Sequence, residues 1–299
     1  MIEISIILPT HNPNLRRLME TLNGLRNQTL QLHYWELIIV DNNSQPPINV
    51  NIDWHPNHQI ITENNQGLTP ARISGFKASS ADIIVMVDDD NILSTTYLES
   101  ALSIFKNNVT LGAAGGKIFP VFEAPPPSWL SEFHHILALR NYGDDIIIKQ
   151  WDKTYPSMAP VGAGMVIRKE ALQTYLGSPR LISDRKGNSL SSGGDNDIVL
   201  EILKSGWEIG YYPNLKLSHI ISKERTTVSY ISKLMNSSNK SWIQLLSYHQ
   251  INPWKGISKL TLPLRKIRSW FNCRAWKNDA NYIRWCGTCG TFDGLANVK

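Results

Sequence analysis

The stretch ADIIVMVDDDNIL, residues 81–93, carries an apolar run directly into three consecutive aspartates. The run at 83–87 has the length and composition of a fully buried strand. Neighbouring carboxylates repel one another, and protonation cannot relieve all of them near pH 7. Mg²⁺ and Mn²⁺ prefer oxygen ligands, and Mg²⁺ needs few carboxylates when substrate phosphates supply the rest. A solvated acidic turn would explain the composition but not the buried strand, so the stretch predicts a cation site.

The spacing of the three aspartates gives each one an expected direction. Side chains on an extended segment alternate between its two sides. Asp88 and Asp90 are therefore expected to face one cleft, while Asp89 turns away.

Strand-like and helical patterns alternate along the N-terminal part of the chain. Strands are predicted within residues 2–10, 34–44, 58–67 and 82–90, with helices at 12–28 and 68–79 between them. This order predicts a mostly parallel sheet with helices on both faces. Ligands bind such sheets at the carboxyl ends of the strands. The polar residues at those ends, which include Thr10 and Asp41, are therefore expected to converge with Asp88–Asp90.

A second acidic cluster stands in SSGGDNDIVLEILKSGW, residues 191–207. Ile198, Val199, Ile202 and Leu203 form a helical stripe, so Asp195 and Asp197 occupy the start of a helix. The positive end of the helix dipole favours an ionised Asp195. An ordinary capping role for Asp195 is the plain alternative.

Charge divides the 299 residues into two parts. The chain carries 30 basic and 25 acidic residues, but residues 223–299 hold 13 of the bases and 3 of the acids. Three cysteines, all near the C-terminus, indicate reduced thiols rather than a disulfide framework, and no second ligand pair completes CGTC as a zinc site. The sequence begins with a strand rather than a leader, and no apolar run reaches the roughly 18 residues of a membrane span. We therefore expect a cytoplasmic protein that does not span a membrane.

Six segments in order resemble family 2 glycosyltransferases, the inverting GT-A-fold group that makes bacterial surface polysaccharides. They are ISIILPTHN (4–12), LIIVDNNS (37–44), ENNQGLTPARISG (63–75), VMVDDDNIL (85–93), VGAGMVIR (161–168) and GGDNDIVLEILKSGWEIGYYPNLKLSHI (193–220). The resemblance implies a GT-A catalytic domain over residues 1–222, with a donor part to about residue 120 and an acceptor part from about 121 to 222. Residues 223–299 lie outside it as a basic, aromatic, helical extension.

The resemblance also implies roles for particular residues. Pro9, Thr10, Asp41, Arg72, Asp88 and Asp89 would bind the nucleotide-sugar donor. Asp90 matches the metal-binding last residue of the family's DxD motif, and Asp195 matches the catalytic base. Where the family more often has glutamate before that aspartate, this chain has Gly194, so the resemblance does not extend to an acceptor contact by that glutamate.

Other roles have competing explanations. His219 is either a further metal ligand or a hydrogen-bonded histidine at a strand end. Asp197 either orients the acceptor or favours the helix dipole, and Gly164 lies in the segment expected near the acceptor. Lys223 and Arg225 are either a lid over the diphosphate or a solvated loop.

The function implied is inverting transfer of a sugar from a nucleoside-diphosphate sugar, UDP-linked by default, to a hydroxyl of a glycan or lipid-linked acceptor. A divalent metal, Mn²⁺ or Mg²⁺, would stabilise the departing diphosphate, and Asp195 would take the hydroxyl proton. A catalytically silent sugar-nucleotide-binding or scaffold protein is the alternative. A dinucleotide-dependent dehydrogenase is excluded, because LPTHNPN stands where GxGxxG would follow the first strand.

The C-terminal region interleaves cations with aromatic side chains. The cations are Lys259, Arg265, Lys266, Arg268 and Arg274, and the aromatics are Trp254, Trp270, Phe271, Trp276 and Trp285. This pattern suits an anionic membrane surface, such as the inner face of the plasma membrane, where each cation adds roughly 1 kcal/mol. Plain packing as a helical cap explains it equally well, and nucleic-acid binding is disfavoured.

Overall fold

The computed structural model describes residues 1–178, 184 and 190–298, which fold into two compact units. The first unit contains Met1–Val121, Ala138–Arg180 and Asp195–Ile220, and the second contains Phe122–Leu137, Leu181–Gly194 and Ile221–Lys299. These are units of packing. The division at residue 222 expected from the sequence concerns function, and it stays a prediction.

Parallel strands form one half of the sheet, as the sequence predicts. They lie in the order β3 (His58–Thr62), β2 (Trp35–Asp41), β1 (Ile4–Thr10) and β4 (Ile83–Met86), and each neighbouring pair is parallel. Every residue of β1 and β4 is buried, which explains why β4 is wholly apolar and β1 is apolar apart from Ser5 and Thr10. The predicted α/β fold, with a mostly parallel central sheet and flanking helices, is confirmed.

Shorter and longer strands extend the sheet beyond β4. The order continues through β8 (Val166–Arg168), β6 (Leu111–Phe122), β9 (Glu208–Ile221) and β5 (Asn91–Leu93), and β7 (Ile147–Lys149) pairs with β9. β8 is antiparallel to both β4 and β6, and β5 is antiparallel to β9. The pairing of β5 with β9 matters for the site, because it places residues directly after Asp90 beside His219.

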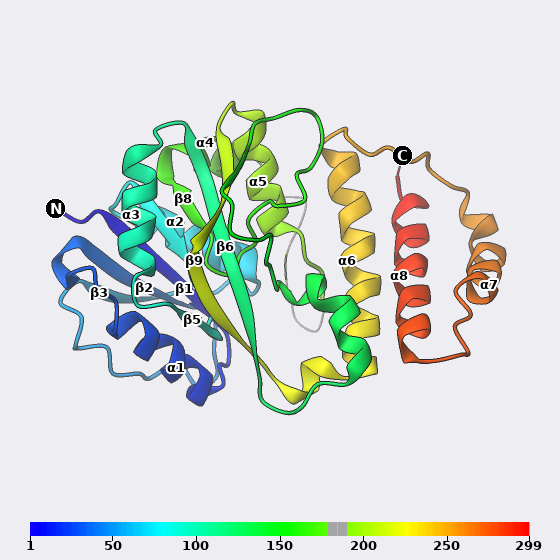
Figure 1. Cartoon of the computed structure of the whole chain (residues 1–299), viewed down its shortest axis with the longest axis horizontal. Helices are drawn as coiled ribbons and strands as arrows, with labels where there is room; N and C mark the ends of the chain where they lie inside the picture. The colour runs from blue at the N-terminus through cyan, green and yellow to red at the C-terminus, as the bar shows by residue number, and fades with distance from the viewer. Residues whose placement is uncertain (179–183, 185–189, 299) are drawn as a thin grey trace. The chain divides into compact units, whose positions relative to one another are not determined.

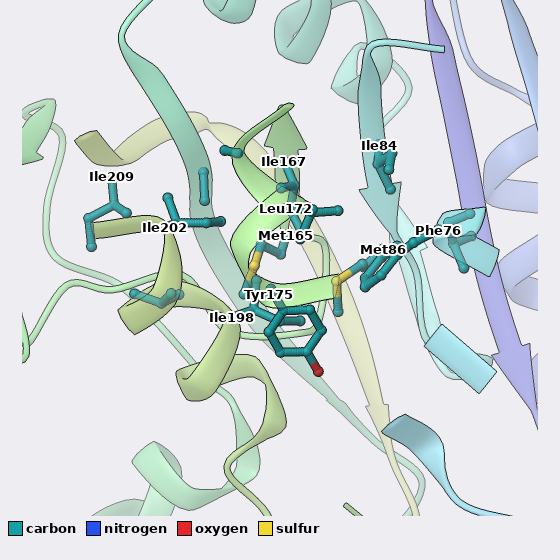
Figure 2. Packing of buried hydrophobic residues seen from close by; sticks show 14 of the residues in the cluster. Phe76, Ile84, Met86, Met165, Ile167, Leu172, Tyr175, Ile198, Ile202 and Ile209 are labelled. Atoms are coloured by element: carbon teal, nitrogen blue, oxygen red, sulfur yellow. The ribbon is translucent and has the colours of Figure 1, made fainter. Parts of the chain in front are cut away.

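Helices flank this sheet in the first unit (Figure 1). They are α1 (Leu15–Arg26), α2 (Leu68–Ala78), α3 (Tyr97–Asn107), α4 (Gln173–Gly177) and α5 (Gly194–Lys204). Buried residues from α2, β4, β8, α4 and α5 pack together, among them Phe76, Met86, Ile167, Tyr175 and Ile198 (Figure 2). The core therefore joins the predicted donor-binding segments to the start of α5, where Asp195 lies.

The second unit is helical, as predicted for the C-terminal region. It contains α6 (Val228–Tyr248), α7 (Leu262–Asn272) and α8 (Asp279–Leu295), together with the 3₁₀ segment η2 (Ser128–Leu137), which packs against α6 and α8. Figure 1 shows α8 between α6 and α7. Gly287, Gly290 and Gly294 line the face of α8 that meets α6, and a β-carbon on Gly290 would come 2.0 Å from the carbonyl oxygen of Asn236. The glycines therefore permit a close approach of the two helices.

Cys273, Cys286 and Cys289 are free thiols. In the described ranges, no helix is both long and apolar enough to cross a bilayer.

Candidate active site

The carboxyl ends of β1 and β2 bring Thr10 and Asp41 together. The two residues are partners in the parallel register, and Pro9 precedes Thr10 in the buried end of β1. The Asp41 carboxylate is buried and accepts backbone N–H groups from Ser44 at 3.0 Å and Ile48 at 3.1 Å. Burial alone would raise the pKa of Asp41, but the hydrogen bonds from Ser44 and Ile48 outweigh it and hold that pKa below its ordinary value. Asp41 is therefore an ionised group that fixes the loop at this strand end.

Asn42 connects this strand end to helix α2. Its side-chain oxygen accepts the N–H of Gly67 at 2.7 Å, and its amide donates to the carbonyls of Glu63 and Asn65, each at 2.9 Å. The loop before α2 is therefore held at the end of β2. This arrangement positions the first turns of α2, which carry Arg72.

The three aspartates after β4 form a turn rather than an extended segment. Val87 continues β4, and the N–H of Asn91 donates to the carbonyl of Asp88 at 3.0 Å, which closes the turn. The alternation expected for Asp88, Asp89 and Asp90 is therefore wrong, because extended geometry ends before them.

Each of the three carboxylates contacts a different part of the site. Asp88 accepts from Arg72, with Oδ1 3.4 Å from Nη2. Asp89 accepts from the hydroxyl of Thr10, at 2.5 Å between oxygens. Asp90 accepts from the amide of Asn91 at 2.9 Å, and its other oxygen lies 3.3 Å from Nε2 of His219. The turn is thus bound to β1, α2 and β9 at once.

Arg72 and Asp195 meet at the same glycine. Arg72 is buried on α2, and a β-carbon on Gly162 would lie 2.3 Å from its Nη2 atom. The N–H of Gly162 donates to Oδ2 of Asp195 at 2.9 Å. Asp88, Arg72, Gly162 and Asp195 therefore form a continuous chain of contacts. The two acidic segments, which are far apart in sequence, lie in one region of the first unit.

Polar groups surround Asp195 at the start of α5. Its Oδ1 accepts the N–H of Asn196 at 3.0 Å, and the amide of Asn196 donates to the hydroxyl of Tyr155 at 2.9 Å. Burial, together with the nearby charge of Asp195, raises the pKa of Tyr155, so this hydroxyl stays protonated. Asp195 is thus a carboxylate held by two backbone N–H groups beside a neutral phenol.

Asp90 and His219 offer a donor set that fits a divalent cation. The β5–β9 register pairs Asn91 with His219, which sets the imidazole beside Asp90. Two ligands at about 2.1 Å from one ion, at right angles, lie about 3 Å apart. The observed 3.3 Å between Asp90 Oδ2 and His219 Nε2 suits that arrangement. Carboxylate oxygen with imidazole nitrogen is a donor set that Mn²⁺ accepts.

The remaining predicted residues are placed as follows. Gly164 has a φ of +75°, and its carbonyl accepts from the hydroxyl of Tyr97, so its described contacts are structural. Asp197 is buried in the first turn of α5. Lys223 and Arg225 lie in the 3₁₀ segment η4 (Lys223–Thr226) of the second unit. Roles for these residues at the acceptor or as a lid stay predictions.

Sequence reasoning missed several residues that shape the site. Gly162 stands inside the quoted segment VGAGMVIR. Its role depends on the donation of its N–H to Asp195 and on the close approach of Arg72, and the residue type reveals neither partner. No sequence pattern indicates a role for Asp184. Its carboxylate accepts the N–H of Gly194 at 2.8 Å, so a carboxylate stands beside the position where the family more often has glutamate.

A small hollow adjoins the loop that holds Asp195. Its lining includes Val161 and Ala163, the neighbours of Gly162, together with Arg140, Tyr142 and Tyr211. The two tyrosine rings meet edge to face, with centroids 5.3 Å apart.

Comparisons with known proteins match this chain to one family of enzymes. The sequence model described as "Glycosyl transferase family 2" matches residues 5–176. The glucosyl-dolichyl phosphate glucuronosyltransferase of Haloferax volcanii is 21% identical over 271 residues, which cover 88% of this chain and 78% of that protein. The poly(ribitol-phosphate) beta-N-acetylglucosaminyltransferase TarP of Staphylococcus aureus is 29% identical over 113 residues, covering 36% of this chain and 34% of TarP.

A solved structure supports the same fold over nearly the whole chain. The crystal structure of S. aureus TarS residues 1–349 superposes with a TM-score of 0.54 at 12% identity, and the match covers 99% of this chain and 90% of that one. The structure of the same protein in complex with UDP gives the same values. At this identity the likeness establishes the fold.

Proposed function

Because the chain belongs to glycosyl transferase family 2 and is a glycosyltransferase, we propose that it moves a sugar from a nucleoside-diphosphate sugar to an acceptor hydroxyl with inversion. The observation that carries this proposal is the chain of contacts from Asp88 through Arg72 and Gly162 to Asp195. In this chain of contacts, the Arg72 guanidinium proposed for the donor and the Asp195 carboxylate proposed for the acceptor both contact Gly162.

Asp195 is the proposed general base. In an inverting transfer, the acceptor hydroxyl attacks the anomeric carbon from the face opposite the leaving diphosphate, and a base removes its proton as the bond forms. Backbone N–H groups of Gly162 and Asn196 hold the Asp195 carboxylate, and the protonated Tyr155 stands beside it. These contacts orient the carboxylate.

The leaving diphosphate requires positive charge. Arg72 would bind it as a permanently charged, buried guanidinium whose position Asp88 fixes. Asp90 and His219 would hold a divalent metal, Mn²⁺ or Mg²⁺, which supplies Lewis-acid stabilisation when bound. Thr10 supports the same turn through its hydrogen bond to Asp89.

The substrates are proposed from the relatives. TarS binds UDP, and on that ground we propose a UDP-sugar as donor, with Pro9, Thr10 and Asp41 at the nucleotide. The names of the relatives include a dolichyl phosphate and a poly(ribitol phosphate) substrate. They support a glycan or a lipid-linked acceptor here, and a lipid-linked acceptor would suit a cytoplasmic enzyme that associates peripherally with the membrane.

Two substitutions separate the proposed roles. Asp195→Asn should leave UDP binding in the presence of Mn²⁺ unchanged while lowering turnover by about 10²–10⁴-fold, the usual contribution of a general base. Asp90→Ala should weaken metal-dependent UDP binding as well. Isothermal titration with UDP, with and without Mn²⁺, and a transfer assay over a panel of nucleotide sugars would measure both effects. Asp145→Asn, at an exposed position, is the matched control.

Each outcome bears on a different part of the proposal. A fully active Asp195→Asn enzyme would remove the base. Activity that survives complete chelation would remove the metal. Tight UDP binding without transfer or donor hydrolysis, across the whole panel, would instead favour a silent binding protein.

A further inference from the structure

Helix α7 has one face that packs inside the second unit. Ser269 is buried there, and Trp270 meets Trp285 of α8 edge to face, with ring centroids 4.7 Å apart. The indole N–H of Trp285 donates to the carbonyl of Lys266 at 3.0 Å, and the Lys266 ammonium pairs with Asp293 at 2.7 Å. Two tryptophans and one lysine of the basic, aromatic segment are therefore accounted for by packing.

The opposite face of the same helix is apolar and exposed. Leu264, Ile267 and Phe271 recur at helical spacing on the side of α7 away from the buried Ser269, and the exposed Leu260 lies in the 3₁₀ segment just before the helix. Trp276 extends it, because its ring meets that of Phe271 at 5.8 Å between centroids. We call Leu260, Leu264, Ile267, Phe271 and Trp276 the α7 stripe. Their side chains are between 57% and 90% exposed.

Basic side chains border the α7 stripe. Lys259, Arg265, Arg268, Arg274 and Lys277 are all exposed. The sequence contains no aspartate or glutamate from residue 225 to residue 278, so no acid on this segment offsets them. An apolar row with a cationic margin on one short helix is the pattern of helices that lie in the plane of a membrane interface.

We propose that the α7 stripe inserts at the boundary between the head groups and the acyl chains of an anionic lipid bilayer, with the bordering cations at the lipid phosphates. The helix would lie flat, its apolar row buried below the head groups, while the long side chains of Arg265 and Arg268 reach back to the charged surface. Trp276 suits the same depth, because indole rings favour the membrane–water interface. The proposal concerns the second unit alone, and it holds whether or not Asp195 is the base.

A second copy of the chain is a poorer occupant of the stripe. In a two-fold dimer the same patch lies on both subunits, so Arg265, Arg268 and Arg274 would approach the identical cations of the other copy. An anionic lipid surface instead supplies the opposite charge over the whole margin. Charge complementarity therefore selects the membrane.

Vesicle binding by the full chain tests the proposal. Sedimentation would be compared between vesicles of phosphatidylcholine alone and vesicles with about one third phosphatidylglycerol. The unmodified chain should bind the anionic vesicles, and raising the salt from about 0.1 M to about 0.5 M should weaken that binding. Leu264→Asn with Ile267→Asn should lower the partition coefficient by ~100-fold, since two large side chains no longer leave water.

Two further variants complete the design. Leu15→Asn with Val109→Asn removes equally exposed apolar residues from the first unit and should bind vesicles as the unmodified chain does. Arg265→Gln with Arg268→Gln should weaken binding to anionic vesicles by about 25-fold, about fivefold for each cation, and should leave binding to neutral vesicles unchanged. Near-ultraviolet circular dichroism would report whether the Trp270–Trp285 contact persists.

The results that overturn the proposal are distinct. The first is that the unmodified chain does not bind anionic vesicles. The second is that the stripe variant binds them as well as the Leu15/Val109 control does. The third is that the unmodified chain is a dimer in solution and binds no vesicles, while the stripe variant is a monomer. Should the stripe variant lose its near-ultraviolet signal, the arginine variant decides alone, and unchanged anionic binding overturns the proposal. Transfer to a soluble acceptor, assayed in parallel without lipid, reports separately on the proposed catalytic function.

Discussion

The Arg72 guanidinium lies against Gly162 so closely that a β-carbon there would stand 2.3 Å from Nη2 and 3.1 Å from Cζ. No positive φ demands glycine at this position, so close approach is the reason that a side chain is absent. Arg72 is held from the other side by Asp88, at 3.4 Å. Gly162 therefore sets where the buried cation of the site can lie.

Replacement of Gly162 by alanine should move the Arg72 guanidinium. The N–H that donates to Asp195 remains in the alanine variant, so the proposed base keeps its contact while the cation shifts. We expect UDP affinity and turnover both to fall, by about tenfold or more, since about 1.4 kcal/mol of lost diphosphate interaction gives that factor. Titration calorimetry with UDP and a transfer assay would measure the two effects.

Gly177→Ala is the matched control for this substitution. A β-carbon on Gly177 meets nothing within 4 Å, and its φ is not positive. It should change neither UDP affinity nor turnover. If Gly162→Ala also bound UDP with unchanged affinity, Arg72 would not be a diphosphate ligand.

The N-terminal half of the fold could be predicted because burial on both faces leaves a plain signature. Residues 4–10 are apolar apart from Ser5 and Thr10, residues 83–86 are all apolar, and the structure makes these segments the neighbouring parallel strands β1 and β4. Asp195 could be predicted at a helix start because glycines precede it and an apolar stripe follows. In both cases the local pattern agrees with the tertiary structure.

Other parts of the site depend on contacts that have no local signature. The Asp88–Asp90 turn contradicts the expected alternation, because β5 is only Asn91–Leu93 and its pairing with β9 decides where Asp90 points. Arg168, in the short strand β8, is one residue whose contacts no sequence pattern indicates. In the structure its guanidinium donates to the carbonyls of Phe105, Asn108 and Leu111. Such partners are separated by more than fifty residues, so no pattern in the sequence indicates them.

The basic C-terminal segment shows the same limit in another form. Its interleaved cations and aromatics left membrane binding and plain packing equally supported. The structure assigns the residues to different faces, with Trp270 and Trp285 packed together and Phe271 and Trp276 exposed. Helical spacing separates the packed residues from the exposed ones only once the bounds of α7 are known.

Gly290→Ala should destabilise the second unit. The added methyl group would stand 2.0 Å from the carbonyl oxygen of Asn236, which is backbone and cannot rotate away. Helices α6 and α8 would separate, which weakens the bond from the Asn236 amide to the Cys286 carbonyl at 2.9 Å. We expect the free energy of unfolding to fall by about 1–3 kcal/mol, the usual cost of overpacking. Guanidinium titration followed by circular dichroism would measure it.

Gly256→Ala provides the comparison within the same unit. Its β-carbon would approach no atom closer than 3.4 Å, an ordinary contact. This variant should unfold at the same denaturant concentration as the unmodified chain. Equal midpoints for both variants would show that α6 and α8 can part without loss.

His55 should make the stability of the first unit depend on pH. Its imidazole is fully buried, lies 3.9 Å from the ring of Trp35 between centroids, and accepts the N–H of Asn57. Burial lowers the pKa of His55 from 6.5 to about 4. In the unfolded chain the imidazole takes up a proton near its ordinary pKa, so between these values the unfolded state binds more protons. The stabilising contribution is complete above pH 6.5 and is lost as the pH falls toward the folded-state pKa.

Acidification should therefore lower the free energy of unfolding, by about 2 kcal/mol between about pH 7 and about pH 5. His55→Phe keeps an aromatic ring against Trp35 and removes the titrating group, so its unfolding free energy should fall less over the same range. Some stability would be lost at every pH, because the N–H of Asn57 no longer has its acceptor. His33→Phe, at an exposed position, should retain the full pH dependence. Denaturant titrations at a series of pH values would compare the slopes, and equal slopes for His55→Phe and the unmodified chain would place the acid sensitivity elsewhere.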